Sequence, residues 1–139
     1  MTKDQLKLLI KEEGDYHEWV NNINCFIQRN SLGSWCGYII IPNSFSMDFD
    51  NDIYLNCHGG VTYQSTKDNG DTVIGFDCGH NGDLIPYMFL DRYEIFGDGY
   101  SVYRNKEYVI SEVNSMVEQI LKIRSVQRGI KIDNILNSE

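Results

Sequence analysis

Residues 67–71 (KDNGD) constrain the fold more than any other part of this 139-residue sequence. An Asn-Gly pair between two apolar, β-branched runs is the strongest short-range signal of a β-hairpin. The runs are residues 53–66 (IYLNCHGGVTYQST) and 72–78 (TVIGFDC), and we expect them to pair antiparallel. If the turn is centred near Asn69, the numbers of facing residues sum to about 138. The facing pairs expected from this register are Tyr63 with Gly75, Val61 with Asp77 and Gly60 with Cys78.

A second hairpin is predicted upstream of the first one. Residues 35–41 (WCGYIII) form a β-branched and aromatic run that stops at Pro42, and residues 30–34 have the composition of a turn. We therefore expect residues 24–29 to pair with residues 35–41. Residues 15–23 fit both a helical and a strand pattern, so their secondary structure stays open.

Two helices are expected at the ends of the chain. Thr2 and Gln5 have the spacing of a capping box, and the helix that follows should end near Gly14. Residues 105–128 predict a long amphipathic helix that ends before Gly129. Its apolar stripe consists of Tyr108, Val109, Val113, Met116, Val117, Ile120 and Leu121. The chain is thus expected to form a single α+β domain over residues 1–139, an antiparallel sheet of hairpins covered by the long C-terminal helix and the short N-terminal helix.

The net charge of −8 excludes some partners and favours others. No Lys/Arg cluster of the kind that neutralises a phosphate backbone is evident, so we expect no binding of extended nucleic acid. The scattered acidic residues suit either solubility or docking to a basic protein surface. No apolar run is long enough to span a bilayer and the first residues do not resemble a secretory signal, so no membrane association and a cytoplasmic location are expected. The oligomeric state stays open.

The cysteines and a run of aspartates are not expected to form functional sites. Cys25, Cys36, Cys57 and Cys78 lack CxxC spacing and lie in or beside apolar runs, where reduced core thiols are the expected state. Asp48, Asp50 and Asp52 alternate as in a calcium loop. The glycine and the closing glutamate of an EF-hand are missing, so we do not expect calcium there.

The candidate functional site lies where the central hairpin opens. In the expected register, residues 57–60 (CHGG) and 77–83 (DCGHNGD) leave the sheet at the same end, so two polar, glycine-rich segments come together. Residues 84–103 form a long aromatic loop beside them, and a loop of that length often covers a site. The residues expected to bind a ligand are His58, Gly59, Gly60, Thr62, Tyr63, Asp77, Gly79, His80 and Asp83.

Four interpretations of this junction remain open. His58 and His80 with Asp77 or Asp83 could hold a divalent metal, with Cys57 or Cys78 added to the set. The same four residues, His58, Asp77, His80 and Asp83, could instead perform acid/base or nucleophilic catalysis. The glycines and polar side chains could also bind a nucleotide-like ligand without catalysis. Finally, the glycines, aspartates and histidines could serve only to build turns.

Four motifs also resemble a family of small, mostly uncharacterised proteins of phages, prophages and other mobile elements of bacteria. They are WCGYIIIP (35–42), HGGVTY (58–63), IGFDCGH with the following GD (74–83), and YVISEVNSMVEQI (108–120). The resemblance implies a phage-type accessory or counter-defence protein, of the kind that captures a nucleotide signal or blocks a host defence protein. It implies no particular activity, so a small metal-dependent or acid/base hydrolase and an acidic protein-docking module stay as alternatives.

Overall fold

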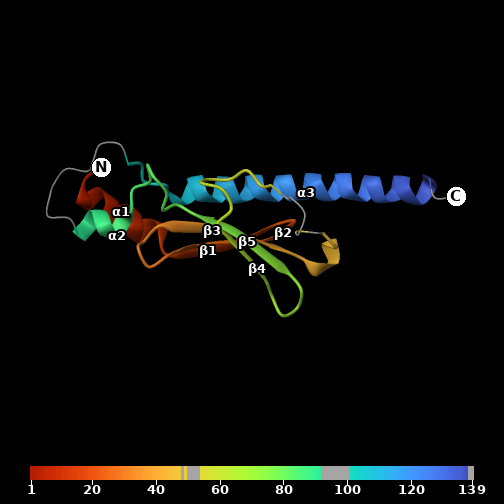
Figure 1. Ribbon diagram of the computed structural model, residues 1–139. Helices are drawn as coiled ribbons and strands as arrows, with labels where there is room; N and C mark the ends of the chain where they lie inside the picture. The colour runs from red at the N-terminus through yellow and green to blue at the C-terminus, as the bar shows by residue number, and fades with distance from the viewer. Residues whose placement is uncertain (48, 50–53, 92–100, 138–139) are drawn as a thin grey trace.

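The computed structural model describes residues 1–47, 49, 54–91 and 101–137, and for residues 131–134 the backbone only. It consists of a five-stranded antiparallel sheet, with the strand order β1-β2-β3-β5-β4, and a long helix that lies along one face (Figure 1). This arrangement confirms the α+β fold. The elements are α1 (Lys3–Glu13), β1 (Tyr16–Asn21), β2 (Ile23–Arg29), β3 (Trp35–Ile41), η1 (Asn43–Phe45), β4 (Tyr63–Thr66), β5 (Thr72–Asp77), α2 (Pro86–Asp91) and α3 (Lys106–Asn137).

The predicted register of the central hairpin is confirmed where the strands pair. Tyr63 lies opposite Gly75, and the ladder continues to Thr66 opposite Thr72. The ladder ends at Tyr63, so the expected pairs Val61–Asp77 and Gly60–Cys78 do not form, and the preceding residues 54–62 are not strand. The reason is the conformation of the two glycines that follow His58. Gly59 and Gly60 both have positive φ angles, and the Gly60 N–H closes a tight turn onto the Cys57 carbonyl.

Residues 15–23, whose pattern fits both a helix and a strand, contain strand β1. It pairs over its full length with β2, from Tyr16 opposite Gln28 to Asn21 opposite Ile23. The connection is only one residue long, and Asn22 takes the left-handed conformation, with a φ of 62°. The hairpin of β2 and β3 has the expected pairing, with Asn24 opposite Ile40.

Helix α3 covers one face of the sheet and closes the main core. Its buried side chains pack against β2, β3 and β5. Gly37 allows the close approach, because a Cβ atom at this position would lie 2.6 Å from Val113 Cγ2 and 2.7 Å from the Phe76 ring. The fully or nearly fully buried apolar residues of the core include Ile27, Trp35, Ile39, Phe76, Val109, Val113, Met116, Val117 and Ile120.

The N-terminal helix packs in a second, smaller cluster at one end of the sheet. Leu6 of α1 contacts Leu84 and Phe89, which belong to the segment around α2. Both hydrogen bonds of the capping box predicted at Thr2 and Gln5 are present, and the helix ends at Gly14 as expected. The predicted helix boundaries are therefore confirmed at this end of the chain.

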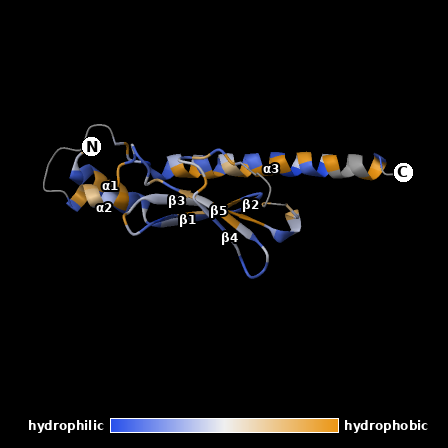
Figure 2. Ribbon diagram, in the orientation of Figure 1, coloured by the Kyte–Doolittle hydropathy of each residue, from blue (hydrophilic) through white to orange (hydrophobic). Residues whose placement is uncertain are grey.

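The C-terminal helix is longer than predicted. It passes through Gly129 and continues to Asn137. Gly129 does not have a positive φ angle and so continues the helix instead of capping it. Beyond the sheet the helix projects away from the domain with apolar and polar side chains intermixed (Figures 1 and 2). Among the side chains of this projecting part that the structure describes, four apolar ones are more than half exposed, namely Val126, Ile130, Ile135 and Leu136.

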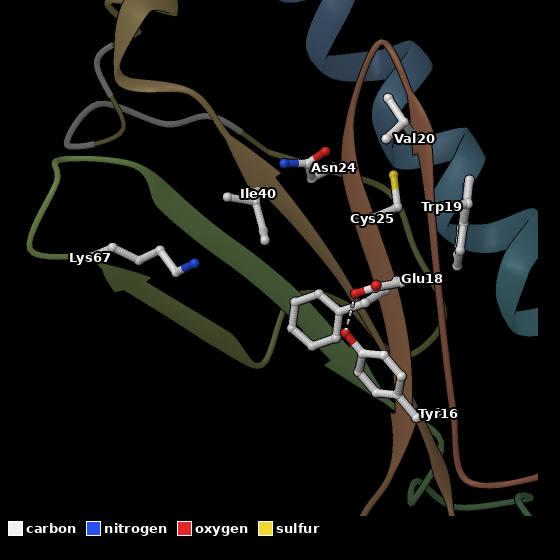
Figure 3. Close-up of a pocket in the computed structure, with 9 residues that line it drawn as sticks. Tyr16, Glu18, Trp19, Val20, Asn24, Cys25, Ile40 and Lys67 are labelled. Carbon is white, nitrogen blue, oxygen red and sulfur yellow. Dashed lines mark hydrogen bonds between the residues drawn. The ribbon is translucent and has the colours of Figure 1, made fainter.

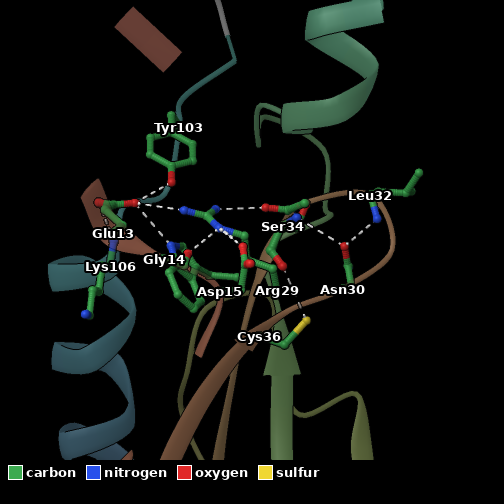
Figure 4. A network of polar contacts seen from close by, with 12 residues as sticks. Glu13, Gly14, Asp15, Arg29, Asn30, Leu32, Ser34, Cys36, Tyr103 and Lys106 are labelled. Atoms are coloured by element: carbon green, nitrogen blue, oxygen red, sulfur yellow. Dashed lines mark hydrogen bonds and ion pairs between the residues drawn. The ribbon is translucent and has the colours of Figure 1, made fainter. Parts of the chain in front are cut away.

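A buried carboxylate joins α1, the sheet and the start of α3 (Figure 4). Glu13 Oε1 accepts hydrogen bonds from Arg29 Nη2 and from Trp35 Nε1, while Oε2 accepts one from the Lys106 N–H in the first turn of α3. The Arg29 side chain is only 3% exposed and also donates to the carbonyls of Gly14 and Gly33. This network fixes the N-terminus of α3 and, with it, the residues that α3 contributes to the candidate site.

None of the helices that the structure describes is long and apolar enough to cross a bilayer. The long helix α3 reaches the required length, but charged residues recur along it.

Candidate functional site

His58 and Asp83 bring the two glycine-rich segments together, as the hairpin predicts. His58 Nε2 lies 2.8 Å from Asp83 Oδ2 and 3.0 Å from Oδ1, across 25 positions of sequence. The His58 side chain is 12% exposed and the Asp83 side chain 1%, so the contact is almost dry. The turn at Gly59 and Gly60 directs the imidazole toward the end of β5, where residues 77–83 leave the sheet.

Asp83 is the buried centre of the site. Its Oδ2 also accepts a hydrogen bond from the His80 N–H at 3.0 Å, and its Oδ1 accepts one from Arg104 Nε at 2.9 Å. Burial acts to raise the pKa of Asp83, but the hydrogen bonds from His58, Arg104 and the His80 backbone outweigh it and lower the pKa. Asp83 is therefore a carboxylate at neutral pH that orients its partners and has no free lone pair facing solvent.

Helix α3 adds residues that the sequence patterns did not identify as part of the site. The Tyr108 hydroxyl lies 2.7 Å from His58 Nδ1 and donates to Glu112 Oε1 at 3.4 Å. Both ring nitrogens of His58 are thus occupied within the protein. The apolar-stripe prediction assigned Tyr108 to the core, and Glu112 and Arg104 received no role. The missed signal was the spacing of Tyr108 and Glu112, which are four residues apart and so share one side of the helix.

Asp77 and His80 form the accessible part of the site. Their side chains are 35% and 32% exposed, and His80 Nε2 lies 3.3 Å from Asp77 Oδ1. Asp77 Oδ1 accepts the Gly79 N–H at 2.9 Å, and Oδ2 accepts the Thr62 hydroxyl at 3.1 Å. His80 Nε2 itself is shielded from solvent but makes no well-aligned hydrogen bond within the described residues. Its contact with Asp77 is therefore close but is not aligned as a hydrogen bond.

The glycines of the site serve packing as well as turn geometry. The His80 ring packs on the backbone of Gly59, where a Cβ atom would lie 2.2 Å from His80 Cδ2. Gly59 also has a φ of +68°, a conformation that side-chain-bearing residues rarely adopt. As a result, the His58 and His80 rings lie with their centroids 6.0 Å apart. Gly60, Gly79 and Gly82 shape the two turns around them.

One predicted site residue lies apart from the cluster. Tyr63 is on strand β4, its ring meets the ring of Tyr38 edge to face, and it faces the open side of the sheet. Thr62, next to it, does join the site through Asp77. Of the aromatic loop expected to cover the site, residues 84–91 include α2, residues 92–100 lie outside the described part, and Val102 returns to form a bridge with Asp83.

The cysteines of the junction do not join its polar network. Burial raises the pKa of Cys57 to about 11 and raises the pKa of Cys78 further. Both thiols are buried and protonated at neutral pH, which makes them poor nucleophiles and poor metal ligands. In the part of the chain that the structure describes, no group of three or more His, Cys, Asp or Glu side chains has an arrangement that could hold a metal ion. Asp48, Asp50 and Asp52 of the acidic segment lie outside that part.

Comparison of the chain with models of known protein families, with curated proteins and with solved structures finds no match. The resemblance to phage proteins therefore stays a prediction. The site combines one arginine, two histidines and three carboxylates at the meeting point of three chain segments, residues 57–62, 77–83 and 104–112. Such a site can bind an anionic group through Arg104 and His80, or can transfer a proton through the Asp77–His80 pair.

Proposed function

We propose that the chain is a phage-type accessory or counter-defence protein that binds a small nucleotide-derived ligand at this junction. The observation that carries the proposal is the way in which the Arg104 guanidinium is held. Arg104 Nε donates a hydrogen bond to Asp83 Oδ1 at 2.9 Å. Arg104 Cζ lies over the Tyr108 ring, 5.2 Å from the ring centroid. No further hydrogen bond of this guanidinium is found among the described residues, so its two terminal nitrogens are left to bind a ligand.

An oriented guanidinium fork suits a phosphate group. Arginine binds phosphate oxygens in pairs, with a directionality that lysine lacks. The chain carries a net charge of −8, so an anionic ligand needs local positive charge to overcome the general repulsion. Arg104 supplies that charge at this place. His80 Nε2, which lies 3.3 Å from Asp77 Oδ1 without hydrogen-bond alignment, adds a second contact point for the ligand.

A second candidate function is a small acid/base hydrolase, and the Asp77–His80 pair favours it. A carboxylate 3.3 Å from an imidazole nitrogen can orient the ring for proton transfer, as it does beside a general base. Both side chains are about one-third exposed and so within reach of a substrate. His58 is unsuited to this role, because Tyr108 and Asp83 occupy its two nitrogens.

The test begins with ligand retained by the purified protein. Mass spectrometry of the supernatant after denaturation should reveal a phosphate-containing molecule in a ratio near one per chain. The variant Arg104→Lys keeps the charge but loses the fork, so it should retain at least tenfold less ligand. Arg128→Lys on the exposed, projecting part of α3 is the matched control and should retain as much as the wild-type protein.

The variants also separate the two candidate functions. Two results together would refute the proposal of nucleotide binding. The wild-type protein would release no ligand, and a panel of mono-, di- and cyclic nucleotides would leave its melting temperature unchanged. If a nucleotide is consumed instead, and His80→Gln stops turnover while Arg128→Lys does not, the hydrolase becomes the better description. Circular dichroism of each variant checks that the fold is intact.

A further inference from the structure

His58 connects the buried carboxylate of Asp83 to the hydroxyl of Tyr108. Its Nε2 atom lies 2.8 Å from Asp83 Oδ2, and its Nδ1 atom lies 2.7 Å from the Tyr108 oxygen. The three side chains come from separate segments, since 25 positions of sequence separate His58 from Asp83 and 50 separate it from Tyr108. The order of the groups, carboxylate, imidazole and hydroxyl, is that of the triads in which a histidine activates a nucleophile.

The positions of the protons follow from the ionisation of Asp83. Burial acts to raise the pKa of Asp83, but the hydrogen bonds that it accepts outweigh burial and lower the pKa, so the carboxylate can only accept. The contact with His58 therefore needs a proton on Nε2. A neutral imidazole then has its lone pair on Nδ1, so the Tyr108 O–H donates the hydrogen bond and Nδ1 accepts it. His58 thus faces Tyr108 with the atom that a general base uses.

The Tyr108 hydroxyl has one near acceptor and one more distant one. The distance from the hydroxyl oxygen is 2.7 Å to His58 Nδ1 and 3.4 Å to Glu112 Oε1. Burial and the charge of Glu112 raise the pKa of Tyr108, although Arg104 acts in the opposite direction. The hydroxyl is therefore protonated at neutral pH, and it needs a base before it can act as a nucleophile.

Arg104 brings a group that can hold phosphate to the same tyrosine. Asp83 accepts hydrogen bonds from His58 and from Arg104, so one carboxylate holds both the base and the guanidinium. The guanidinium carbon lies over the Tyr108 ring, 5.2 Å from its centroid. The Arg104 side chain is 27% exposed and Tyr108 is half-buried. A phosphate bound by the terminal nitrogens of Arg104 therefore lies beside the tyrosine that His58 contacts.

We propose that Tyr108 is a nucleophile that His58 activates and that attacks the phosphorus atom of a phosphodiester in the ligand. The reaction rests on the proposed function, because Arg104 must hold a nucleotide-derived ligand for it to occur. The Tyr108 oxygen forms a bond to phosphorus, and the bond from phosphorus to the leaving oxygen breaks. The hydroxyl proton passes to His58 Nδ1 and from there to the leaving oxygen.

Water completes the reaction in a second step of the same kind. It attacks the phosphorus of the phosphotyrosine and gives a proton to His58 Nδ1, while the bond from phosphorus to the Tyr108 oxygen breaks. That proton then returns from His58 to the tyrosine oxygen. One water is consumed, one phosphodiester bond is hydrolysed, and the chain returns to its starting state.

Tyr16 is a matched control for the reactivity of Tyr108. Its hydroxyl also donates to a carboxylate, that of Glu18 at 2.7 Å, and it lines a surface pocket of about 640 Å³ (Figure 3). Tyr16 is 53% exposed, more than the half-buried Tyr108. Among the residues that the structure describes, no imidazole is hydrogen-bonded to the Tyr16 hydroxyl. Exposure alone therefore favours reaction at Tyr16, whereas activation by a base favours reaction at Tyr108.

The test is covalent labelling with an aryl sulfonyl fluoride, a probe that forms a stable bond with activated hydroxyl groups. Near neutral pH, peptide mass spectrometry should find at least tenfold more label on Tyr108 than on Tyr16. His58→Gln should lower the labelling of Tyr108 at least tenfold, and Glu18→Gln should leave it unchanged. Circular dichroism checks the fold of each variant. If His58→Gln does not fold, the comparison of the two tyrosines in the wild-type protein still decides.

Turnover of a model phosphodiester tests the reaction itself. The wild-type protein should release nitrophenol from bis(4-nitrophenyl) phosphate, and Tyr108→Phe should release it at least a hundredfold more slowly. Turnover that survives in Tyr108→Phe and is lost in His80→Gln would overturn the proposal and assign the chemistry to the Asp77–His80 pair.

Two labelling results would also overturn the proposal. They are preferential labelling of Tyr16, and equal labelling of Tyr108 in the wild-type protein and in His58→Gln. Retained nucleotide without labelling of Tyr108 would leave a protein that only binds its ligand, with the proposed function intact. Labelling of Tyr108 needs no phosphate ligand, so the reactive hydroxyl and the proposed nucleotide binding can fail independently of each other.

Discussion

Asp83 Oδ2 lies 2.8 Å from His58 Nε2 in a contact from which solvent is almost excluded, and this pair joins the two halves of the candidate site. The same carboxylate binds Arg104 through its other oxygen, so a single side chain holds three segments in place. A site built in this way has a buried part that maintains the geometry and an exposed part, Asp77 and His80, that can contact a ligand. The two parts should respond differently to substitution.

Asp83→Asn should destabilise the fold strongly. The amide removes the charge that compensates Arg104, and breaking a buried ion pair from one side costs about 3 kcal/mol. Asp77→Asn is the matched control, since Asp77 is one-third exposed and its loss should cost less than about 1 kcal/mol. Urea unfolding monitored by circular dichroism measures both. Equal losses for the two variants would contradict the division into a buried and an exposed part.

Stability should also depend on pH through Asp83. The pKa of this carboxyl is lower in the folded protein than its ordinary value of 3.8, so the folded state favours the ionised form. Its contribution is therefore fully present above the pKa of the unfolded chain and is lost as the pH falls through the lower pKa of the folded state. Urea midpoints measured from pH 7 down to pH 3 should fall below about pH 5. The decrease should be smaller in Asp83→Asn, and an identical profile in both proteins would refute the assignment.

The four cysteines should be slow to react in the folded protein. Burial raises the pKa values of Cys25 and Cys57 to about 11, so only about one thiol in a thousand is ionised at pH 8. Cys36 and Cys78 are also buried, with raised pKa values. Ellman's reagent should therefore detect few thiols in native buffer and four in 6 M guanidinium chloride. If the native protein instead reacts at once with one full equivalent of Ellman's reagent, one thiolate is accessible, and a cysteine nucleophile becomes a candidate again.

Local signals in the sequence were sufficient for the helix start at Thr2, the two hairpins and the register of Tyr63 with Gly75. Each depends on residues close together in the chain, such as the Asn-Gly turn or the capping box. Residues 15–23 could not be assigned in this way, because a strand and a helix both accommodate their pattern and pairing with β2 decides between them. Gly129 likewise looked like a helix end, but its neighbours continue the helix through it.

The location of the site was predictable and its composition only in part. Hairpin register alone brought residues 57–60 close to residues 77–83. Arg104, Tyr108 and Glu112 join them because α3 packs across the sheet at Gly37, a long-range contact that no local pattern encodes.

Gly59 and Gly60 allow a direct test of how the junction is packed. Both have positive φ angles, so alanine at either position should cost about 1 kcal/mol in backbone strain. At Gly60 a Cβ atom would meet nothing within 4 Å, and this strain is the only expected effect. At Gly59 it would lie 2.2 Å from His80 Cδ2, so the imidazole must move away from the turn and from Asp77.

Gly59→Ala should therefore lose about 2–3 kcal/mol in urea unfolding and Gly60→Ala only about 1 kcal/mol. The difference should also appear in the histidine signals of a proton–nitrogen NMR spectrum, where the His80 resonances shift in Gly59→Ala and stay in place in Gly60→Ala. Ligand retention should follow the NMR result, because His80 Nε2, the proposed ligand contact, is displaced together with the ring. If the two variants lose equal stability and leave His80 unmoved, the imidazole does not pack on the Gly59 backbone, and its position beside Asp77 must have another cause.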